Sequence, residues 1–286
     1  MSGARTVLTL PENMRGPHTR VAAVIGDPIS HSLSPRLHNA AFAALGLDWI
    51  YVACHVPEGG VTEAIEDMRN LGFEGLSVTM PHKAAVASAV DTLSATATKL
   101  GVVNCVRVQD EQLVGENTDG VGLLNSLRSQ MGINMDGLGV VVVGAGGAAR
   151  SVALALVENG CTVGVYNRTE RSAVEVVEIV GGASSVVQQS AIREADLVIN
   201  ATPLGMATND SMPFDVDLLR DGQRVVDLIY KPAKTALLEE AESRGLQTLN
   251  GLGMLLYQAG EQFRLWTGHQ PPIKRMAESV GITVEG

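Results

Sequence analysis

The chain has 286 residues, of which 45% are hydrophobic and 18% charged, and a formal net charge of −10 at pH 7. The length suggests about two domains, and the composition provides a sizeable apolar core and argues against disorder. The negative charge argues against nucleic-acid and anionic-membrane partners, because the chain has no excess of positive charge to neutralise their phosphate groups. No run of about 18 apolar residues occurs, so we expect no transmembrane helix.

Residues 1–20 lack an apolar signal segment, so we interpret them as a loose tail. The three cysteines, Cys54, Cys105 and Cys161, are odd in number and lack metal-ligand spacing. We expect buried free thiols, a reducing compartment and a cytoplasmic location. No metal site is expected, because acidic or cysteine partners at metal spacing are missing beside His31, His38 and His82.

From Val21 the chain alternates between strand and helix patterns, which predicts an α/β fold. In the first half, strands are predicted at 20–25, 49–56 and 75–79, helices at 34–45, 61–71, 81–90, 95–99 and 118–131, and a hairpin over 102–116. In the second half, strands are predicted at 138–143, 162–166, near Val186, and at 197–200, 224–227 and 246–249, with helices at 148–157, 254–267 and 273–280.

We therefore expect two α/β domains around a cleft, the C-terminal one a Rossmann-type nucleotide-binding domain. The first, residues 21–118, lacks a glycine fingerprint and should bind the substrate and carry the catalytic groups. The second is expected over 119–250. The helices of 251–286 are expected to return to the first domain.

The segment from Gly26 to Pro35 follows a predicted strand and opens a predicted helix. Hydroxyl groups of Ser32 and Ser34 in such a turn can bind a carboxylate with help from the helix N-terminus. The same serines can equally cap the helix, and the spacing alone leaves both interpretations open.

Two further helix starts carry charged residues. Lys83 stands just inside a predicted helix, where it faces the positive end of the helix dipole, which favours a functional reason over a merely solvated lysine. Asp119 opens the long helix, where an acid suits the dipole, so its simplest interpretation is a first-turn acid.

A glycine-rich turn lies between the apolar strand 138–143 and the helix 148–157. Gly144, Gly146 and Ala149 match the pattern G-x-G-x-x-A of dinucleotide-binding turns. Such a turn lets the backbone approach a pyrophosphate, and the helix N-terminus offers free N–H groups. The flanking strand and helix make a dinucleotide site the favoured interpretation.

The end of the next strand distinguishes NAD from NADP. An NAD site usually has an acid there, whereas this chain has Asn167 followed by Arg168 and Arg171. Guanidinium groups can bind a 2′-phosphate with paired hydrogen bonds, so the pattern predicts NADP(H). The alternative is a solvated loop that happens to hold two arginines.

Taken together, these motifs resemble the shikimate dehydrogenase family. The shared segments, in order along the chain, are Gly26–Pro35, Val78–Lys83, Val103–Asn104, Asn117–Gly120, Gly144–Arg150, Asn167–Thr169, Asn200–Thr202 and Asn250–Ala259. They run from about Val21 to the C-terminus, and their order makes coincidence implausible.

The resemblance implies reversible hydride transfer between NADPH and 3-dehydroshikimate, giving shikimate for aromatic amino acid biosynthesis. It implies that Lys83 and Asp119 form the catalytic pair. The implied substrate-binding residues are Ser32, Ser34, Thr79, Asn104, Tyr230 and Gln258. The implied cofactor-binding residues are Gly144, Ala145, Gly146, Gly147, Ala148, Asn167, Arg168, Thr169, Arg171, Thr202, Gly251 and Met254.

One position departs from the family pattern: Ser77 stands where the family usually has Asn. A hydroxyl replaces an amide with two donors, which leaves room for a quinate/shikimate or aminoshikimate dehydrogenase. A non-catalytic dinucleotide or metabolite sensor is a third hypothesis, although Lys83 and Asp119 are both present. We expect a monomer or homodimer with small-molecule ligands.

Overall fold

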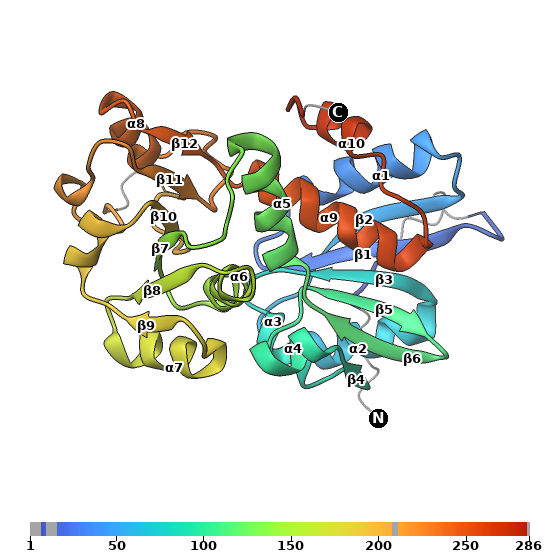
Figure 1. Cartoon of the computed structure of the whole chain (residues 1–286). Helices are drawn as coiled ribbons and strands as arrows, with labels where there is room; N and C mark the ends of the chain where they lie inside the picture. The colour runs from blue at the N-terminus through green and yellow to red at the C-terminus, as the bar shows by residue number, and fades with distance from the viewer. Residues whose placement is uncertain (1–6, 10–15, 208–210, 285–286) are drawn as a thin grey trace. The chain divides into compact units, whose positions relative to one another are not determined.

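The computed structural model describes residues 7–9, 16–207 and 211–284. The chain divides into two compact units, the first made of Met1–Thr118 with Leu256–Gly286 and the second of Asp119–Leu255. Each unit holds a six-stranded sheet with helices packed on it (Figure 1). No helix within the described ranges is long and apolar enough to cross a membrane. The predicted α/β class is confirmed.

The sheet of the first unit has the strand order β2-β1-β3-β5-β6-β4. Its strands are β1 (Arg20–Gly26), β2 (Trp49–His55), β3 (Phe73–Val78), β4 (Thr92–Leu93), β5 (Cys105–Gln109) and β6 (Gln112–Glu116). Its helices are α1 (Ser34–Ala44), α2 (Val61–Leu71), α3 (Lys83–Ala87), α4 (Ala95–Leu100), most of α9 (Leu252–Thr267) and α10 (Ile273–Ser279).

The central strand β1 is parallel to both β2 and β3, whereas β3, β5 and β6 pair antiparallel in turn. β1 reads RVAAVIG and is buried from its second residue onward, as expected of a parallel strand covered on both faces. In Figure 1, α1 and α10 lie on one side of this sheet and α2, α3 and α4 on the other.

The interpretation of residues 1–20 as a loose tail is wrong for the described residues 7–9. Leu8 is buried and belongs to the apolar core of the first unit. The backbone N–H groups of Val7 and Leu8 donate to the Asp67 carboxylate at 2.6 and 2.9 Å. This anchor lies about 60 residues away in sequence, so local composition does not reveal it.

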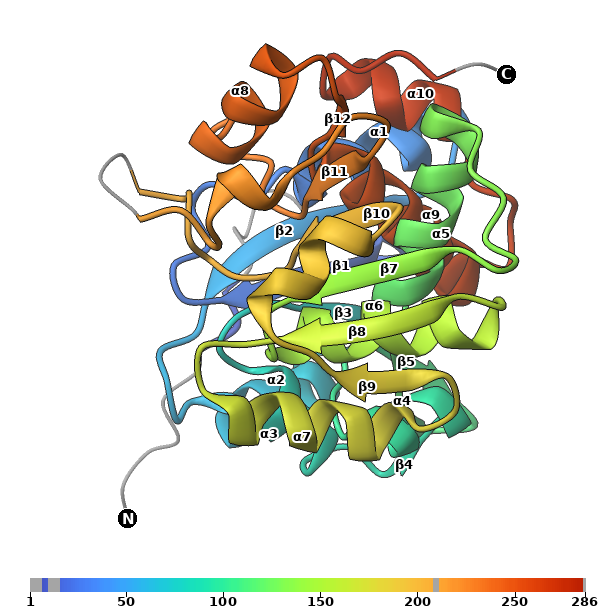
Figure 2. The same cartoon turned by 60° about the vertical axis from the view of Figure 1, so that its left-hand side comes forward.

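The sheet of the second unit is entirely parallel, with the order β12-β11-β10-β7-β8-β9 (Figure 2). Its strands are β7 (Gly139–Val143), β8 (Thr162–Tyr166), β9 (Ser184–Val186), β10 (Leu197–Asn200), β11 (Arg224–Asp227) and β12 (Gln247–Leu249). Its helices are α5 (Asp119–Met131), α6 (Gly147–Glu158), α7 (Glu170–Val180), η2 (Gln189–Glu194), η3 (Val216–Leu218) and α8 (Ala236–Ser243).

Numbered within this unit, the strand order is 3-2-1-4-5-6, the Rossmann order. Apolar side chains of β7, β10 and β11 pack against residues of η2, η3 and α8 in one core cluster. The predicted Rossmann-type C-terminal domain is therefore confirmed.

Most predicted elements agree with the structure to within one or two residues at their ends. The largest differences are helices α7 and α8, which the patterns did not predict. The helix predicted over 81–90 is only Lys83–Ala87. The strand predicted at 75–79 begins earlier, at Phe73. The hairpin turn falls at Asp110 and Glu111, with φ of 51° and 65°.

Candidate active site

In the first unit, two chain segments meet at the carboxyl edge of the sheet beside β1. The chain passes from β1 to β2 on one side and then to β3 on the other, and ligands of α/β sheets bind at such a switch of direction. Thr79 N donates to Ile25 O at 3.0 Å, and Asp27 N donates to Met80 O at 3.0 Å. The predicted serine and Thr79 segments therefore leave the sheet side by side.

Gly26 is the residue that permits this close approach. A Cβ atom at Gly26 would lie 2.5 Å from Thr79 Cγ2 and 3.2 Å from Met80 O. Any other residue would push the two segments apart. The glycine is thus explained by packing between β1 and the segment after β3.

Neither predicted serine is the N-cap residue of helix α1. The N-cap is Leu33, which forms no side-chain cap hydrogen bond, and Pro35 lies in the first turn. Ser32 Oγ accepts a hydrogen bond from Ser34 N at 3.3 Å, and Ser34 is buried. The Ser32 hydroxyl therefore satisfies one N–H group of the first turn of α1 without being its N-cap, and the carboxylate-binding role of both serines remains a prediction.

Lys83 is the first residue of α3, and its backbone is held on both sides. Val103 N donates to Lys83 O at 2.9 Å. The preceding His82 is buried, and its ring Nε2 lies 2.7 Å from Val56 O. His82 therefore has a structural role, and the half-buried Lys83 side chain starts from a well-defined position.

A buried polar cluster lies at the same edge of the first unit's sheet. Asn104, just before β5, donates through Nδ2 to Gln258 Oε1 of α9 at 3.4 Å. These two predicted substrate-binding residues are therefore neighbours. Sequence reasoning missed Gln262 and Tyr51, which join the same cluster through Ser77. The available signal was that Gln262 lies four residues after Gln258, on the same face of a helix.

In the second unit, Asp119 is the first residue of α5 and is buried. An acid in the first turn suits the helix dipole. Gly120 follows it, where a Cβ atom would lie 2.6 Å from Ala155 Cβ and 2.8 Å from Ser151 O. The glycine lets α5 and α6 approach closely, which fixes the backbone at Asp119.

The predicted dinucleotide turn lies at the direction switch of the second sheet, between β7 and β10. Gly144 has a φ of +117°, and a Cβ atom there would lie 2.9 Å from Ala201 O. Gly146 is the N-cap of α6 and forms no side-chain cap, and a Cβ atom there would meet nothing within 4 Å. Packing does not require Gly146, and its role beside a ligand stays a prediction.

The segment after β8 carries the basic residues predicted to bind the ribose phosphate. Asn167 Nδ2 donates to Thr169 O at 2.9 Å, which closes the turn before α7. Arg168 and Arg171 are exposed. Arg171 Nε lies 3.5 Å from Glu175 Oε1.

Two arginines of this region share one acid. Arg150 of α6 also reaches Glu175, with its Nη2 atom 3.9 Å from Oε2. Arg150 and Arg171 therefore share the Glu175 carboxylate of α7. Guanidinium groups of this kind can bind a 2′-phosphate, and that role stays a prediction.

Thr202 is held in place through a buried carboxylate that sequence reasoning missed. Thr202 Oγ1 donates to Asn200 Oδ1 at 2.7 Å, and Asn200 Nδ2 donates to Asp227 Oδ1 at 3.0 Å. Ile229 N donates to the same oxygen at 3.0 Å, and Thr235 Oγ1 donates to Asp227 Oδ2 at 2.7 Å. Burial raises the pKa of Asp227, and these hydrogen bonds oppose the shift. The sequence feature that could have revealed Asp227 is an acid at the end of the apolar strand RVVD.

Replacing Asp227 with alanine is expected to lower the free energy of unfolding by about 3 kcal/mol, because three donors lose a buried acceptor. Asp227→Asn keeps one acceptor oxygen and should cost about 1 kcal/mol. Urea unfolding followed by circular dichroism measures both. Asp221→Ala, at an exposed position, is the matched control. Equal stability of Asp227→Ala and this control would contradict the assignment.

Gly251 and Met254, both predicted to line the cofactor site, lie at the start of α9. A Cβ atom at Gly251 would clash with the backbone oxygen of Leu228, and Gly251 N donates to Ile229 O at 3.0 Å. Met254 is buried. Gly251 is therefore required by packing, and cofactor contact by either residue stays a prediction. Tyr230 directly follows Ile229 and is partly buried, and burial raises its pKa.

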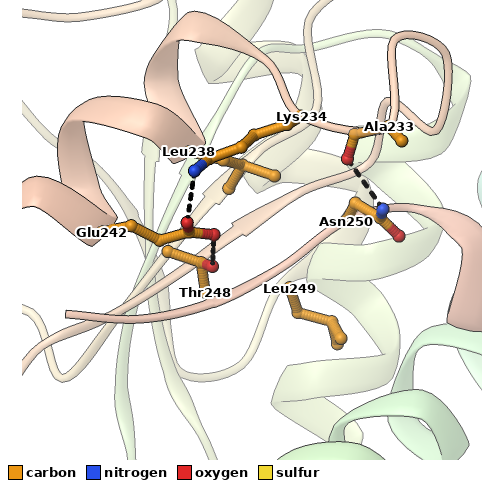
Figure 3. Close-up of a pocket in the computed structure, with 7 residues that line it drawn as sticks. All are labelled: Ala233, Lys234, Leu238, Glu242, Thr248, Leu249 and Asn250. Carbon is orange, nitrogen blue, oxygen red and sulfur yellow. Dashed lines mark hydrogen bonds and ion pairs between the residues drawn. The ribbon is translucent and has the colours of Figure 1, made fainter.

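A separate pocket of the second unit has none of the predicted site residues in its lining (Figure 3). Lys234 Nζ lies 2.6 Å from Glu242 Oε2, and Thr248 Oγ1 donates to Glu242 Oε1 at 2.7 Å. Asn250 Nδ2 donates to Ala233 O at 2.8 Å. These polar groups bind one another, so the pocket is not a candidate for the substrate site.

Three family models match the chain. They are the shikimate dehydrogenase substrate binding domain at residues 24–106, shikimate / quinate 5-dehydrogenase at 126–209, and the shikimate 5′-dehydrogenase C-terminal domain at 251–280. A relative from Methanopyrus kandleri, named shikimate dehydrogenase (NADP(+)), is 41% identical over 275 residues, which cover 92% of this chain and 95% of the relative.

Solved structures agree with these matches. Shikimate dehydrogenase from Aquifex aeolicus has a TM-score of 0.88 at 34% identity, covering 93% of this chain and 99% of that one. Shikimate 5-dehydrogenase from Thermus thermophilus, in complex with NADP(H) and shikimate, has a TM-score of 0.85 at 38% identity, covering 91% and 98%. The chain belongs to the shikimate dehydrogenase family.

Proposed function

We propose that this protein is an NADP-dependent shikimate dehydrogenase, which reversibly reduces 3-dehydroshikimate to shikimate. The observation that carries the proposal is the 41% identity to a shikimate dehydrogenase (NADP(+)) across 92% of the chain. The oxidoreductase activity and the NADP(H) cofactor predicted from the motifs agree with this relative and with the Thermus thermophilus complex. The reaction belongs to aromatic amino acid biosynthesis.

The residues of the chain fit the needs of ketone reduction. Bound NADPH supplies the hydride, and the oxygen of the substrate must receive a proton as the hydride arrives at carbon. We assign proton donation to the Lys83 ammonium, which also stabilises the developing negative charge. In the oxidation direction the neutral amine takes the proton back. Asp119 is proposed as the second catalytic residue, orienting the substrate hydroxyl.

The remaining predicted residues keep their proposed binding roles. We assign the substrate carboxylate to Ser32 and Ser34, and the ring and its hydroxyls to Thr79, Asn104, Tyr230 and Gln258. We assign pyrophosphate to the turn from Gly144 through Ala145, Gly146 and Gly147 to Ala148. The ribose phosphate is assigned to Asn167, Arg168, Thr169 and Arg171, and the nicotinamide side to Thr202, Gly251 and Met254. A cytoplasmic monomer or homodimer is also proposed.

The arginines after β8 lead us to expect a kcat/KM for NADP at least ~100-fold above that for NAD. Arg168→Ala should reduce this preference by about tenfold, since hydrogen bonds to charged groups contribute roughly 1.5–3 kcal/mol. Steady-state kinetics with both cofactors and isothermal titration of NADP measure the effect. The exposed Arg193 provides the matched control, Arg193→Ala. A native enzyme that prefers NAD would overturn the assignment of this segment.

Ser77 favours a second candidate, a quinate/shikimate or aminoshikimate dehydrogenase. Its hydroxyl contacts Tyr51 and Gln262 within the fold, where the family usually has an amide. A steady-state assay with shikimate, quinate and the amino analogue, each with NADP and NAD, distinguishes the candidates. Highest kcat/KM for shikimate supports the main proposal, and a higher value for another substrate supports the second. Binding of NADPH and shikimate without turnover would support a sensor.

A further inference from the structure

The buried cluster of the first unit contains a side-chain amide whose orientation is determined by the backbone. Gln262 Nε2 donates to the backbone carbonyl of Asn104 at 3.1 Å. A carbonyl oxygen can only accept, so the nitrogen end of the Gln262 amide must lie on this side. The opposite end, Oε1, accepts from Ser77 Oγ at 2.5 Å.

The Ser77 hydroxyl is used to complete this orientation. It accepts from Tyr51 Oη at 2.5 Å while donating its single proton to Gln262 Oε1. Tyr51 and Ser77 are both buried. The residue that departs from the family pattern therefore supports Gln262 from inside the fold.

A second backbone group determines the orientation of Asn104. Thr118 N donates to Asn104 Oδ1 at 2.8 Å. A backbone N–H can only donate, so Asn104 Nδ2 must lie at the other end of the amide. From there it donates to Thr118 Oγ1 at 3.0 Å and to Gln258 Oε1 at 3.4 Å.

Both determined amides point a donor at the same atom of Gln258. Its Oε1 accepts from Gln262 Nε2 at 2.8 Å as well as from Asn104 Nδ2. The Gln258 backbone is also held, because Thr118 Oγ1 donates to Gln258 O at 3.2 Å. The oxygen end of the Gln258 amide therefore faces the cluster, and its two N–H donors lie at the opposite end of the same planar group.

We propose that Gln262 is a positioning residue, which orients the Gln258 amide so that it offers the substrate hydrogen-bond donors. This inference rests on the proposed function, in which Gln258 contacts the ring substituents. A donor suits both redox forms of the substrate, since a hydroxyl and a ketone oxygen can each accept a hydrogen bond. A reversed amide would place its oxygen against the ketone oxygen and repel it.

The sharpest test is Gln258→Glu. A carboxylate can still accept from Gln262 and Asn104, but it offers an oxygen in place of the N–H donors. We expect the KM for shikimate to rise at least ~10-fold, with an unchanged Kd for NADP by isothermal titration. Unchanged KM in a folded variant would overturn the proposal.

Gln262→Met tests the positioning role directly, because methionine fills a similar space without polar groups. We expect the KM for shikimate to rise several-fold, with a smaller change in kcat and an unchanged Kd for NADP. The neighbouring Glu261→Gln is the matched control on α9 and should leave all three values unchanged. Thermal unfolding of each variant tests folding, and Gln262→Glu decides the matter if Gln262→Met does not fold.

Gln262→Glu adds a readout that a purely structural role would not change. The ionised carboxylate of this variant would place oxygens against Asn104 O and Gln258 Oε1, so the Gln258 amide is expected to reverse. Protonation restores a donor, so the KM for shikimate should fall again as the pH is lowered. A KM that does not depend on pH beyond the native profile would contradict the proposal. Failure of the proposed function is distinct, since the native protein itself would then not oxidise shikimate.

Discussion

Replacement of Lys83 with alanine is expected to lower kcat for shikimate oxidation by at least ~100-fold, with a much smaller change in substrate binding. Reduction of the ketone requires a proton donor at the oxygen, and oxidation of the alcohol requires a base there. Lys83 is the first residue of α3, and its backbone is held by Val103. A hundredfold loss corresponds to about 2.7 kcal/mol of transition-state stabilisation.

Steady-state kinetics in both directions, together with titration of shikimate binding, measure this effect. Lys99→Ala is the matched control, because Lys99 lies exposed in the last turn of α4 in the same unit. Its kcat should stay within about a factor of two of the native value, on the order expected for a surface position. A Lys83→Ala enzyme with near-native kcat would refute the assigned role.

Stability of the native protein is expected to fall as the pH decreases from about 6.5 toward 3, in part because of His38. His38 is fully buried, with its ring stacked on Tyr51 at 4.3 Å between centroids and 5.0 Å from the Trp266 ring. Burial lowers the pKa of His38 to about 3, and its proximity to Gln262 opposes part of the shift.

The direction of this pH dependence of stability follows from the lowered pKa of His38. Above about pH 6.5 the imidazole is neutral in both states, so its contribution to stability is complete. As the pH falls, the unfolded chain binds a proton that the folded chain does not, and the contribution is lost down to about pH 3. Because a pKa difference of one between the folded and unfolded states is equivalent to roughly 1.4 kcal/mol, the loss reaches at most about 5 kcal/mol.

His38→Phe keeps an aromatic ring in the stack and removes the titration. The unfolding free energy of the native protein minus that of the variant should therefore decrease as the pH falls from about 7 to about 4. Urea unfolding across this range measures it. His269→Phe, at an exposed position, is the control and should run parallel to the native protein. Parallel curves for the native protein and His38→Phe would refute the buried neutral imidazole.

Local patterns predicted the strands and most helices, because these elements depend on residues close in sequence, but they missed helices α7 and α8. The valine run before Gly144, the turn and helix α6 all appear where the spacing placed them. The helix at Lys83 is shorter than its apolar pattern suggested and ends at Ala87. Helix ends depend on what the following residues contact, and Asp91 N here donates to Leu113 O.

The candidate site was predictable only where one short segment carries the signal. Gly144, Arg168 and Lys83 stand in motifs that are each complete within a short run of sequence. Asp227 and Gln262 escaped prediction, since their partners are far away in the chain. Asp227 reaches Asn200 across 27 residues, and Gln262 reaches Ser77 across 185.

The sequence by itself determined the α/β class, the family and the dinucleotide turn, because these follow from periodicity, glycine placement and ordered motifs. Only the tertiary structure decided that Leu8 is anchored, that His38 is buried and that the Gln258 amide faces inward with its oxygen. The physical reason is that burial and hydrogen-bond direction depend on which distant backbone groups meet. A lone N–H at Thr118 and a carbonyl at Asn104 orient two side-chain amides that no local pattern connects.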